Sequence, residues 1–213
     1  MSAGEAIYFL SAAGIEGPDL EAWLSAAPAH LDAGERARLE RYIFPEKKLE
    51  FALGRLLLKS VLAARHGVED PRIGDDARGK PCLVDRPGGP FFNLSHSRGA
   101  LAAIVSPSRE VAIDIEAVRP YSAGLAGKVL SPAERARVRE TADFYRFWTA
   151  KEAFMKLEGR GLAIPPLRLE VDLDARTVRD LATGALEPFA GELRGAHAVA
   201  WMARATPLSG HGA

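Results

Sequence analysis

Two carboxylates in a short apolar stretch are the first residues in this sequence that could do chemistry. Asp114 and Glu116 alternate with Ile113 and Ile115, a pattern that predicts a strand. Successive side chains of a strand point to opposite faces, so the two acids share one face, about 7 Å apart. They repel each other unless a cation lies near them. Carboxylate oxygens in such a pair suit Mg²⁺.

A third carboxylate and a lysine lie on one face of a predicted helix over residues 141–158, which Gly159 ends. Glu152 and Lys156 are one turn apart. Periodicity alone favours an exposed ion pair between them, worth about 0.3–0.5 kcal/mol. Tyr145 and Thr149 extend the same face. The opposite face carries the apolar residues that are expected to enter the core: Phe147, Ala150, Phe154 and Leu157.

Basic residues are concentrated in the first half of the chain. Between Glu35 and His66 there are eight Lys and Arg residues against four acidic ones. This excess is too sparse for a nucleic-acid-binding arm. Farther along, residues 95–99 (Ser-His-Ser-Arg-Gly) read as a polar turn between two strands.

The elements that must position these residues alternate between strands and helices. The longest helix is predicted from Pro45 to His66, with Gly67 as its stop, and its apolar stripe comprises Leu49, Leu53, Leu56, Leu57, Val61 and Ala64. Other helices are expected over residues 17–24 and 32–41 and from 131. Strands are expected at 5–10, 82–84, 91–94, 101–105, 111–116, 167–171 and 198–202. Residues 67–81 read as loop and 209–213 as a frayed end.

Composition describes an ordinary globular chain. Of 213 residues, 47% are hydrophobic, and 28 Lys and Arg balance 28 Asp and Glu, so net charge predicts no partner. Cys82 is the only cysteine, which excludes a disulfide framework and favours a reducing, cytoplasmic location. No signal peptide or membrane-length apolar stretch is expected.

Four motifs together resemble the signature of 4′-phosphopantetheinyl transferases of the surfactin-synthetase-activating type. They are Gly79-Lys80-Pro81, the segments 92–97 and 113–116, and the helical segment 147–156. The resemblance spans residues 79–161, is weaker upstream, and fades before residue 30 and after about 166. Ala112 stands where the family often has Gly, and Glu35 where many relatives have a basic residue.

The resemblance implies an α+β fold. Two similar halves, each a small, mostly antiparallel sheet packed with helices, would be related by a pseudo-twofold axis, with residues 1–108 and 109–213 as the halves. The implied enzyme moves the 4′-phosphopantetheine arm of coenzyme A onto a serine of an apo acyl or peptidyl carrier protein. Adenosine 3′,5′-bisphosphate is released. Such activity serves fatty-acid, polyketide or nonribosomal-peptide biosynthesis.

The resemblance also assigns residues. Mg²⁺ (or Mn²⁺) would be held by Asp114, Glu116 and Glu152. Because a nearby cation depresses a carboxyl pKa, Glu152 is favoured as a ligand, with a general-base role left open. Asp114, Glu152 and Lys156 would be catalytic, and Lys156 would face the pyrophosphate. The residues implied for coenzyme A are Lys80, Ser95, His96, Arg38, Arg41, Arg55, Lys151 and Lys156. Glu134 matches a family acid, although its capping position already explains it.

The expected partner is an acidic, helical carrier domain, with no nucleic acid or membrane, and the chain is expected to be a monomer. Two alternatives remain open from the sequence. One is a protein that binds coenzyme A or a carrier without reacting. The other is a Mg²⁺-dependent nucleotide phosphohydrolase.

Overall fold

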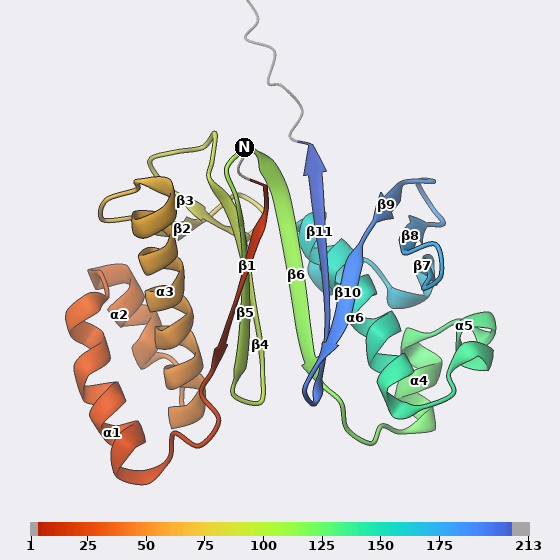
Figure 1. Ribbon diagram of the computed structural model, residues 1–213, viewed down its shortest axis with the longest axis horizontal. Coiled ribbons are helices and arrows are strands. Elements are labelled where there is room, and N and C mark those ends of the chain that lie inside the picture. Colours follow the sequence, from red (N-terminus) through yellow and green to blue (C-terminus); the bar gives the residue numbers. More distant parts are fainter. Residues whose placement is uncertain (1–3, 206–213) are drawn as a thin grey trace, which may run out of the picture.

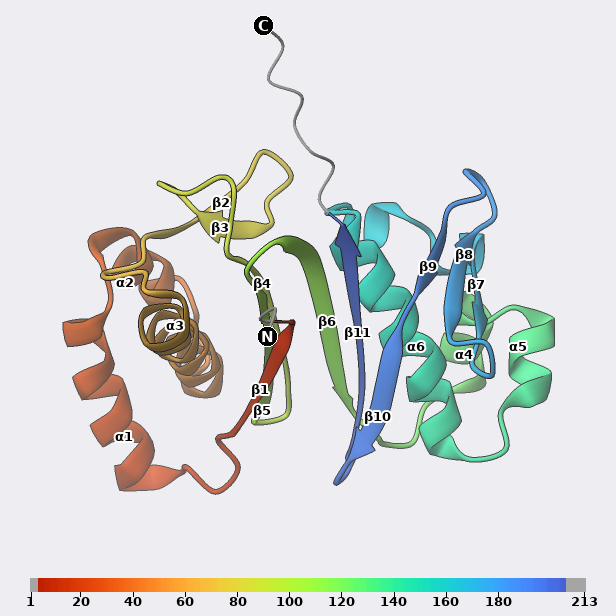
Figure 2. The same ribbon diagram turned by 45° about the horizontal axis from the view of Figure 1, so that its top comes forward.

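Two three-stranded antiparallel sheets form the centre of the molecule, in a computed structural model that describes residues 4–205. A long helix covers the outer side of each sheet, α3 on one and α6 on the other (Figures 1 and 2). The first sheet has the order β1-β5-β4 and the second β10-β11-β6. The bounds are β1 Ala6–Ser11, β4 Phe91–Ser97, β5 Ala100–Ser106, β6 Arg109–Ala117, β10 Ala190–Arg194, β11 His197–Ala205, α3 Pro45–His66 and α6 Thr141–Leu157.

Shorter elements surround this centre. The helices are α1 Gly17–Ala26, α2 Ala33–Glu40, α4 Ala123–Val129 and α5 Pro132–Arg137, with 3-10 turns η1 Ala27–His30, η2 Gly161–Ala163 and η3 Pro166–Arg168. Two small antiparallel sheets are formed by β2 Ile73–Asp75 with β3 Pro81–Leu83, and by β7 Leu169–Asp172, β8 Thr177–Asp180 and β9 Leu186–Pro188. The predicted α+β class is confirmed.

The buried residues fall into clusters that join these layers. Each long helix packs its own cluster against its sheet, and α6 buries Phe147, Ala150, Phe154 and Leu157, as expected. A further cluster is shared by the two sheets: Ala102, Ile104, Val111, Ile113, Ile115 and Val199. In β6 the isoleucines therefore face the other sheet, whereas Asp114 faces the opposite way, toward α6.

Helix α3 has the predicted ends because local chemistry determines both. Pro45 occupies the first helical position, and Gly67 adopts a left-handed conformation (φ 62°) that only glycine adopts readily. The predicted apolar stripe is only partly right: Leu56 and Leu57 are half-buried and Ala64 is exposed. The helix is also covered by α1 and α2, so its buried face is wider and includes Phe51, Ala52, Leu58 and Leu62.

Several strands were missed in the sequence. Strand β2 lies within the segment expected to be loop, and β8, β9 and β10 had no prediction. These are short strands, and β9 and β10 expose Leu186 and Leu193, so their residues do not alternate regularly between apolar and polar. The predicted frayed end, 209–213, lies outside the described residues. Within residues 4–205, no helix combines the length and the apolar character needed to cross a membrane.

Candidate active site

Residues 95–99 are mostly strand rather than the predicted turn. Strand β4 continues through Ser97, and only Arg98 and Gly99 connect it to β5. Both turn residues have positive φ (46° and 77°), the geometry of a tight two-residue hairpin whose twist matches the strands. The prediction was wrong because polar residues in a strand look like a turn when the partner they face is unknown.

That partner is β6 of the other sheet. Three side chains of β4 accept hydrogen bonds from alternate backbone N–H groups of β6: Asn93 from Ile113 (3.0 Å), Ser95 from Ile115 (3.3 Å) and Ser97 from Ala117 (3.1 Å). The two strands belong to different sheets, so side-chain oxygens take the place of backbone carbonyls. The two-residue spacing of these polar side chains matches the two-residue period of β6.

Asp114 lies beside this line of contacts and is buried, with 4% of its surface exposed. Its Oδ1 accepts hydrogen bonds from Lys156 Nζ at 2.7 Å and Ser95 Oγ at 2.8 Å. Its Oδ2 is buried and has no hydrogen-bond partner. A buried carboxylate oxygen left unpaired is costly, so this atom is a candidate ligand for a cation.

Lys156 joins α6 to both neighbouring strands. Besides Asp114, its Nζ donates to Ser95 Oγ (2.9 Å) and to the carbonyl of Ile113 (3.1 Å). The exposed ion pair with Glu152 that periodicity allowed does not form among the residues the structure describes. Lys156 therefore lies directly beside Asp114, and one quarter of its side chain is exposed.

Glu116 and Glu152 are the other members of the predicted metal set. Glu116 accepts a hydrogen bond from Ser97 Oγ at 2.7 Å, and burial raises its pKa. Burial also raises the pKa of Glu152, to about 7, and the negative charges of Asp114 and Glu116 add to this rise. The three carboxylates thus act on one another electrostatically. As arranged, however, no three His, Cys, Asp or Glu side chains within residues 4–205 lie close enough together to form a metal-binding group.

Ser95 and His96, expected to act together on coenzyme A, lie on opposite faces of β4. Ser95 faces Asp114, whereas His96 lines a pocket of about 170 Å³ beside α3. The structure therefore places these two residues, both implied for coenzyme A, on different sides of the strand. His96 Nδ1 lies 3.0 Å from Glu50 Oε2.

Two of the arginines implied for coenzyme A, Arg38 and Arg55, line this pocket beside α3. Both guanidinium groups lie over the Phe51 ring, at 5.7 and 5.3 Å from its centroid. Arg55 is buried, and its Nε lies 3.8 Å from Glu35 Oε1, so the acid at position 35 balances the charge of an arginine here. Arg41 is exposed and does not line this pocket.

Lys80 lines a neighbouring pocket of about 380 Å³ together with Lys156. Pro81 and Leu94 line both pockets, so the two are adjacent. Burial lowers the pKa of Lys80, although the charge of Glu110 opposes this. The structure thus places Lys80 in the same pocket as Lys156, whereas His96 lines the other pocket.

Lys151, predicted to bind coenzyme A, is completely buried. Its Nζ donates to Glu134 Oε2 (2.7 Å) and to the carbonyls of Val129 (2.9 Å) and Pro166 (3.1 Å). All three ammonium donors are used, which leaves none for a ligand. This arrangement speaks against the cofactor assignment, and Lys151 instead links α6 to α4, α5 and η3. Glu134 also caps α5 and is structural, as expected.

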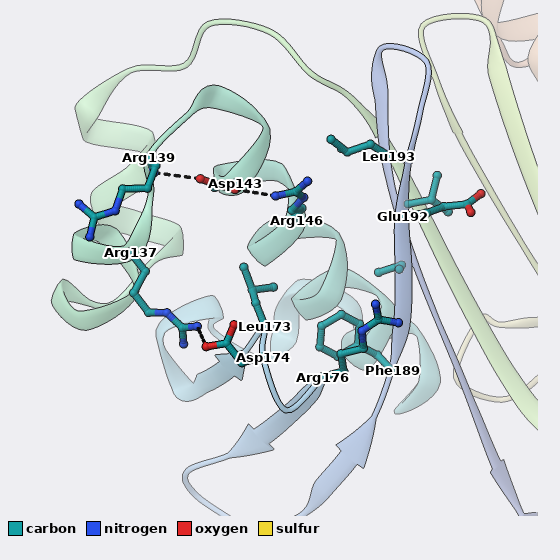
Figure 3. Close-up of a pocket in the computed structure, with 13 residues that line it drawn as sticks. Arg137, Arg139, Asp143, Arg146, Leu173, Asp174, Arg176, Phe189, Glu192 and Leu193 are labelled. Atoms are coloured by element: carbon teal, nitrogen blue, oxygen red, sulfur yellow. Dashed lines mark hydrogen bonds and ion pairs between the residues drawn. The ribbon is translucent and has the colours of Figure 1, made fainter.

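A larger pocket, about 450 Å³, lies elsewhere in the second half (Figure 3). Its walls include four arginines, of which Arg137 is paired with Asp174 (2.6 Å) and Arg146 with Asp143 (2.8 Å). None of the predicted catalytic or metal-binding residues lines it. The two adjoining pockets near β4 are therefore the candidate active site.

Glu50 contributes to this region through His96, although the sequence did not suggest a role for it. In the sequence Glu50 is one acid within a basic region, and its partner His96 lies 46 positions away. Only the fold brings the two together.

Comparison with known proteins points to the same family as the four sequence motifs. Residues 110–202 match the sequence model of the 4′-phosphopantetheinyl transferase superfamily. The chain is 39% identical over 155 residues to the 4′-phosphopantetheinyl transferase HetI of Nostoc, an alignment covering 67% of this chain and 65% of HetI. It is 32% identical over 139 residues to the 4′-phosphopantetheinyl transferase Sfp of Bacillus subtilis, covering 62% and 61%. The L-aminoadipate-semialdehyde dehydrogenase-phosphopantetheinyl transferase of Homo sapiens is 27% identical over 176 residues, covering 73% and 57%. The chain thus matches less than two thirds of the length of each relative.

Proposed function

We propose, from the match of residues 110–202 to the sequence model of the 4′-phosphopantetheinyl transferase superfamily, that this protein is a 4′-phosphopantetheinyl transferase. It would transfer the 4′-phosphopantetheine arm of coenzyme A to a serine hydroxyl of an apo carrier protein. The observation that carries the proposal is the convergence of Asp114, Glu152 and Lys156 between β6 and α6, beside the pockets near β4.

The pocket beside α3 suits the 3′-phosphate of coenzyme A. Arg38, Arg55 and His96 line it, and guanidinium groups bind phosphate through paired hydrogen bonds. The adjoining pocket, lined by Lys80 and Lys156, would receive the pyrophosphate. Adjacent cationic pockets match the two separated phosphate groups of coenzyme A.

The carboxylates present offer the oxygen donors that Mg²⁺ prefers, and they would have to come closer together than they lie in this structure to hold the ion. Asp114 Oδ2 is buried without a partner, and Glu116 and Glu152 are destabilised as anions by burial and by neighbouring acids. Asp114, Glu116 and Glu152 would hold the ion, with Mn²⁺ able to use the same oxygens. When bound, Mg²⁺ neutralises charge that develops on the pyrophosphate oxygens.

In the proposed reaction, the serine Oγ of the carrier forms a bond to the phosphorus of the phosphopantetheine phosphate. The bond from that phosphorus to the bridging oxygen breaks, and adenosine 3′,5′-bisphosphate leaves with the electron pair. Lys156 would stabilise the negative charge on the leaving phosphate. Glu152 would accept the serine proton directly, or through a water if it ligates the ion.

The two halves of the chain would have different roles. Residues 1–108 would grip the nucleotide end of coenzyme A, and residues 109–213 would supply the carboxylates. The two-halves-in-one-chain pattern favours a monomer. A cytoplasmic location would suit the free Cys82.

The test incubates the purified protein with coenzyme A, Mg²⁺ and a panel of apo carrier proteins, and measures carrier mass. A phosphopantetheine adduct on a carrier serine is the expected result. No adduct on any carrier, with coenzyme A bound intact, would instead identify a non-catalytic binding protein. Release of adenosine bisphosphate without a carrier would indicate a phosphohydrolase.

A further inference from the structure

Glu50 is a buried carboxylate that directly contacts a residue of the pocket beside α3. It lies in the second turn of α3 and is 5% exposed. Its Oε2 lies 3.0 Å from His96 Nδ1 and 2.7 Å from Lys47 Nζ, and its Oε1 accepts a hydrogen bond from Gly99 N at 3.3 Å. Burial alone would raise the pKa of Glu50, but these hydrogen bonds, led by that from His96, hold it at about 2. Glu50 is therefore an anion at neutral pH.

The contact determines which nitrogen of His96 is available to a ligand. Nδ1 is used by Glu50, and within residues 4–205 the imidazole has no other hydrogen-bond or ion-pair partner. The ring lines the pocket and is partly exposed. Nε2 is thus the atom that His96 can offer to a molecule in the pocket.

An imidazolium between two anions can donate to both of them. With Nδ1–H directed at Glu50, Nε2–H would donate to a phosphate oxygen, and Arg38 and Arg55 would complete the cationic wall. A neutral hydroxyl in the same place would gain less from this arrangement, because it carries no negative charge for the imidazolium and the two guanidinium groups to attract.

We propose that Glu50 is a positioning residue that sets the preference of this pocket for a phosphate monoester, by holding His96 with Nε2–H available to the phosphate. The inference rests on the proposed function, because the phosphate monoester is the 3′-phosphate of coenzyme A. It predicts discrimination between coenzyme A and dephospho-coenzyme A, which differ only in that phosphate.

The experiment measures dissociation constants for both compounds by calorimetry, with no carrier present. The proteins are the wild type, Glu50→Gln, His96→Gln and the double variant. The preference for coenzyme A should fall about tenfold in Glu50→Gln, equivalent to about 1.4 kcal/mol, while binding of dephospho-coenzyme A changes by less than about twofold. The double variant should match His96→Gln alone, because Glu50 acts through His96.

Glu46→Gln is the matched control, since Glu46 is an exposed acid one turn earlier in α3. It should leave the preference unchanged. An unchanged preference in Glu50→Gln, or additive effects in the double variant, overturns the inference while leaving the proposed function intact if the wild type transfers phosphopantetheine. Failure of the wild type to bind coenzyme A would overturn both.

Discussion

The hydroxyl of Ser95 donates its single hydrogen to Asp114 Oδ1 at 2.8 Å, and accepts from Ile115 N and Lys156 Nζ. A hydroxyl offers one donor and two acceptor positions, so this residue has none left. Ser95 therefore cannot also bind coenzyme A unless it gives up one of these contacts. Ser95 instead connects Asp114, Lys156 and the backbone of β6 in the other sheet.

We expect Ser95→Ala to reduce turnover rather than coenzyme A affinity. Removing the hydroxyl leaves Asp114 and Ile115 N each short of a partner, which should lower the free energy of unfolding by about 1–3 kcal/mol. The misplaced carboxylate should reduce kcat roughly tenfold, with KM for coenzyme A nearly unchanged. Steady-state kinetics and denaturant titration measure both effects.

Ser60→Ala is a suitable control because Ser60 is exposed on α3. It should change neither stability nor rate. A Ser95→Ala enzyme with normal kcat and a raised KM for coenzyme A would instead support the original assignment of Ser95 to the cofactor.

Asp114→Asn and Glu152→Gln should each abolish transfer, since both replace an anion by an amide of the same shape. We expect a loss of at least about 100-fold in kcat with little loss of helix content, because the electrostatic stabilisation they supply is made during the reaction. Product mass and circular dichroism provide the two measurements.

Chelation provides an independent check on the same site. EDTA should stop the wild-type reaction, and Mg²⁺ or Mn²⁺ should restore it. Undiminished transfer in excess EDTA would rule out the proposed ion, and full activity in either variant would remove that residue from the site.

Local signals account for what the sequence predicted well. Pro45 and Gly67 mark the ends of α3 by their own backbone preferences, and Ser131 with Glu134 forms the predicted capping box. The strand of Asp114 was recognisable because apolar and acidic residues alternate there, although both of its faces are buried, the isoleucines between the two sheets and Ala112 against α6.

Relationships between distant segments account for the errors. The polar side chains of β4 looked like a turn because β6, which they bind, belongs to another sheet. The resemblance assigned Lys151 to coenzyme A, and nothing local to α6 reveals its buried partner Glu134, which lies 17 positions earlier on a different helix. Periodicity describes one element at a time, so it cannot identify such partners.

Lys151 and Lys156 should respond differently to the same change. Lys151→Met leaves the buried Glu134 carboxylate without its cation, and we expect a loss of about 3–5 kcal/mol in the free energy of unfolding. Lys156→Met should lower kcat while costing less stability, because Lys156 is partly exposed. Denaturant titration of both variants, followed by kinetics on the folded protein, compares them.

The double variant Lys151→Met/Glu134→Gln should recover part of the lost stability, since it removes the unpaired buried charge. Equal stability losses in Lys151→Met and Lys156→Met would contradict the structural role assigned to Lys151.

The protein should lose stability in acid as Glu50 becomes protonated. Its pKa in the folded chain is about 2, against an ordinary value of 4.5, so folding favours the ionised form. The stabilisation is fully present above pH 4.5 and is lost as the pH falls from 4.5 toward 2. Its size at neutral pH is no more than about 3 kcal/mol.

The measurement compares the free energies of unfolding of the wild type and Glu50→Gln at several pH values from 7 down to 3. The difference should be constant between pH 7 and about 5.5, and should then shrink steadily, because glutamine does not titrate. Taking the difference between the two free energies of unfolding removes the contributions of the other carboxylates, because their titration is common to both proteins. A difference that stays the same down to pH 3 would mean that Glu50 is not stabilised as an anion by His96, Lys47 and Gly99.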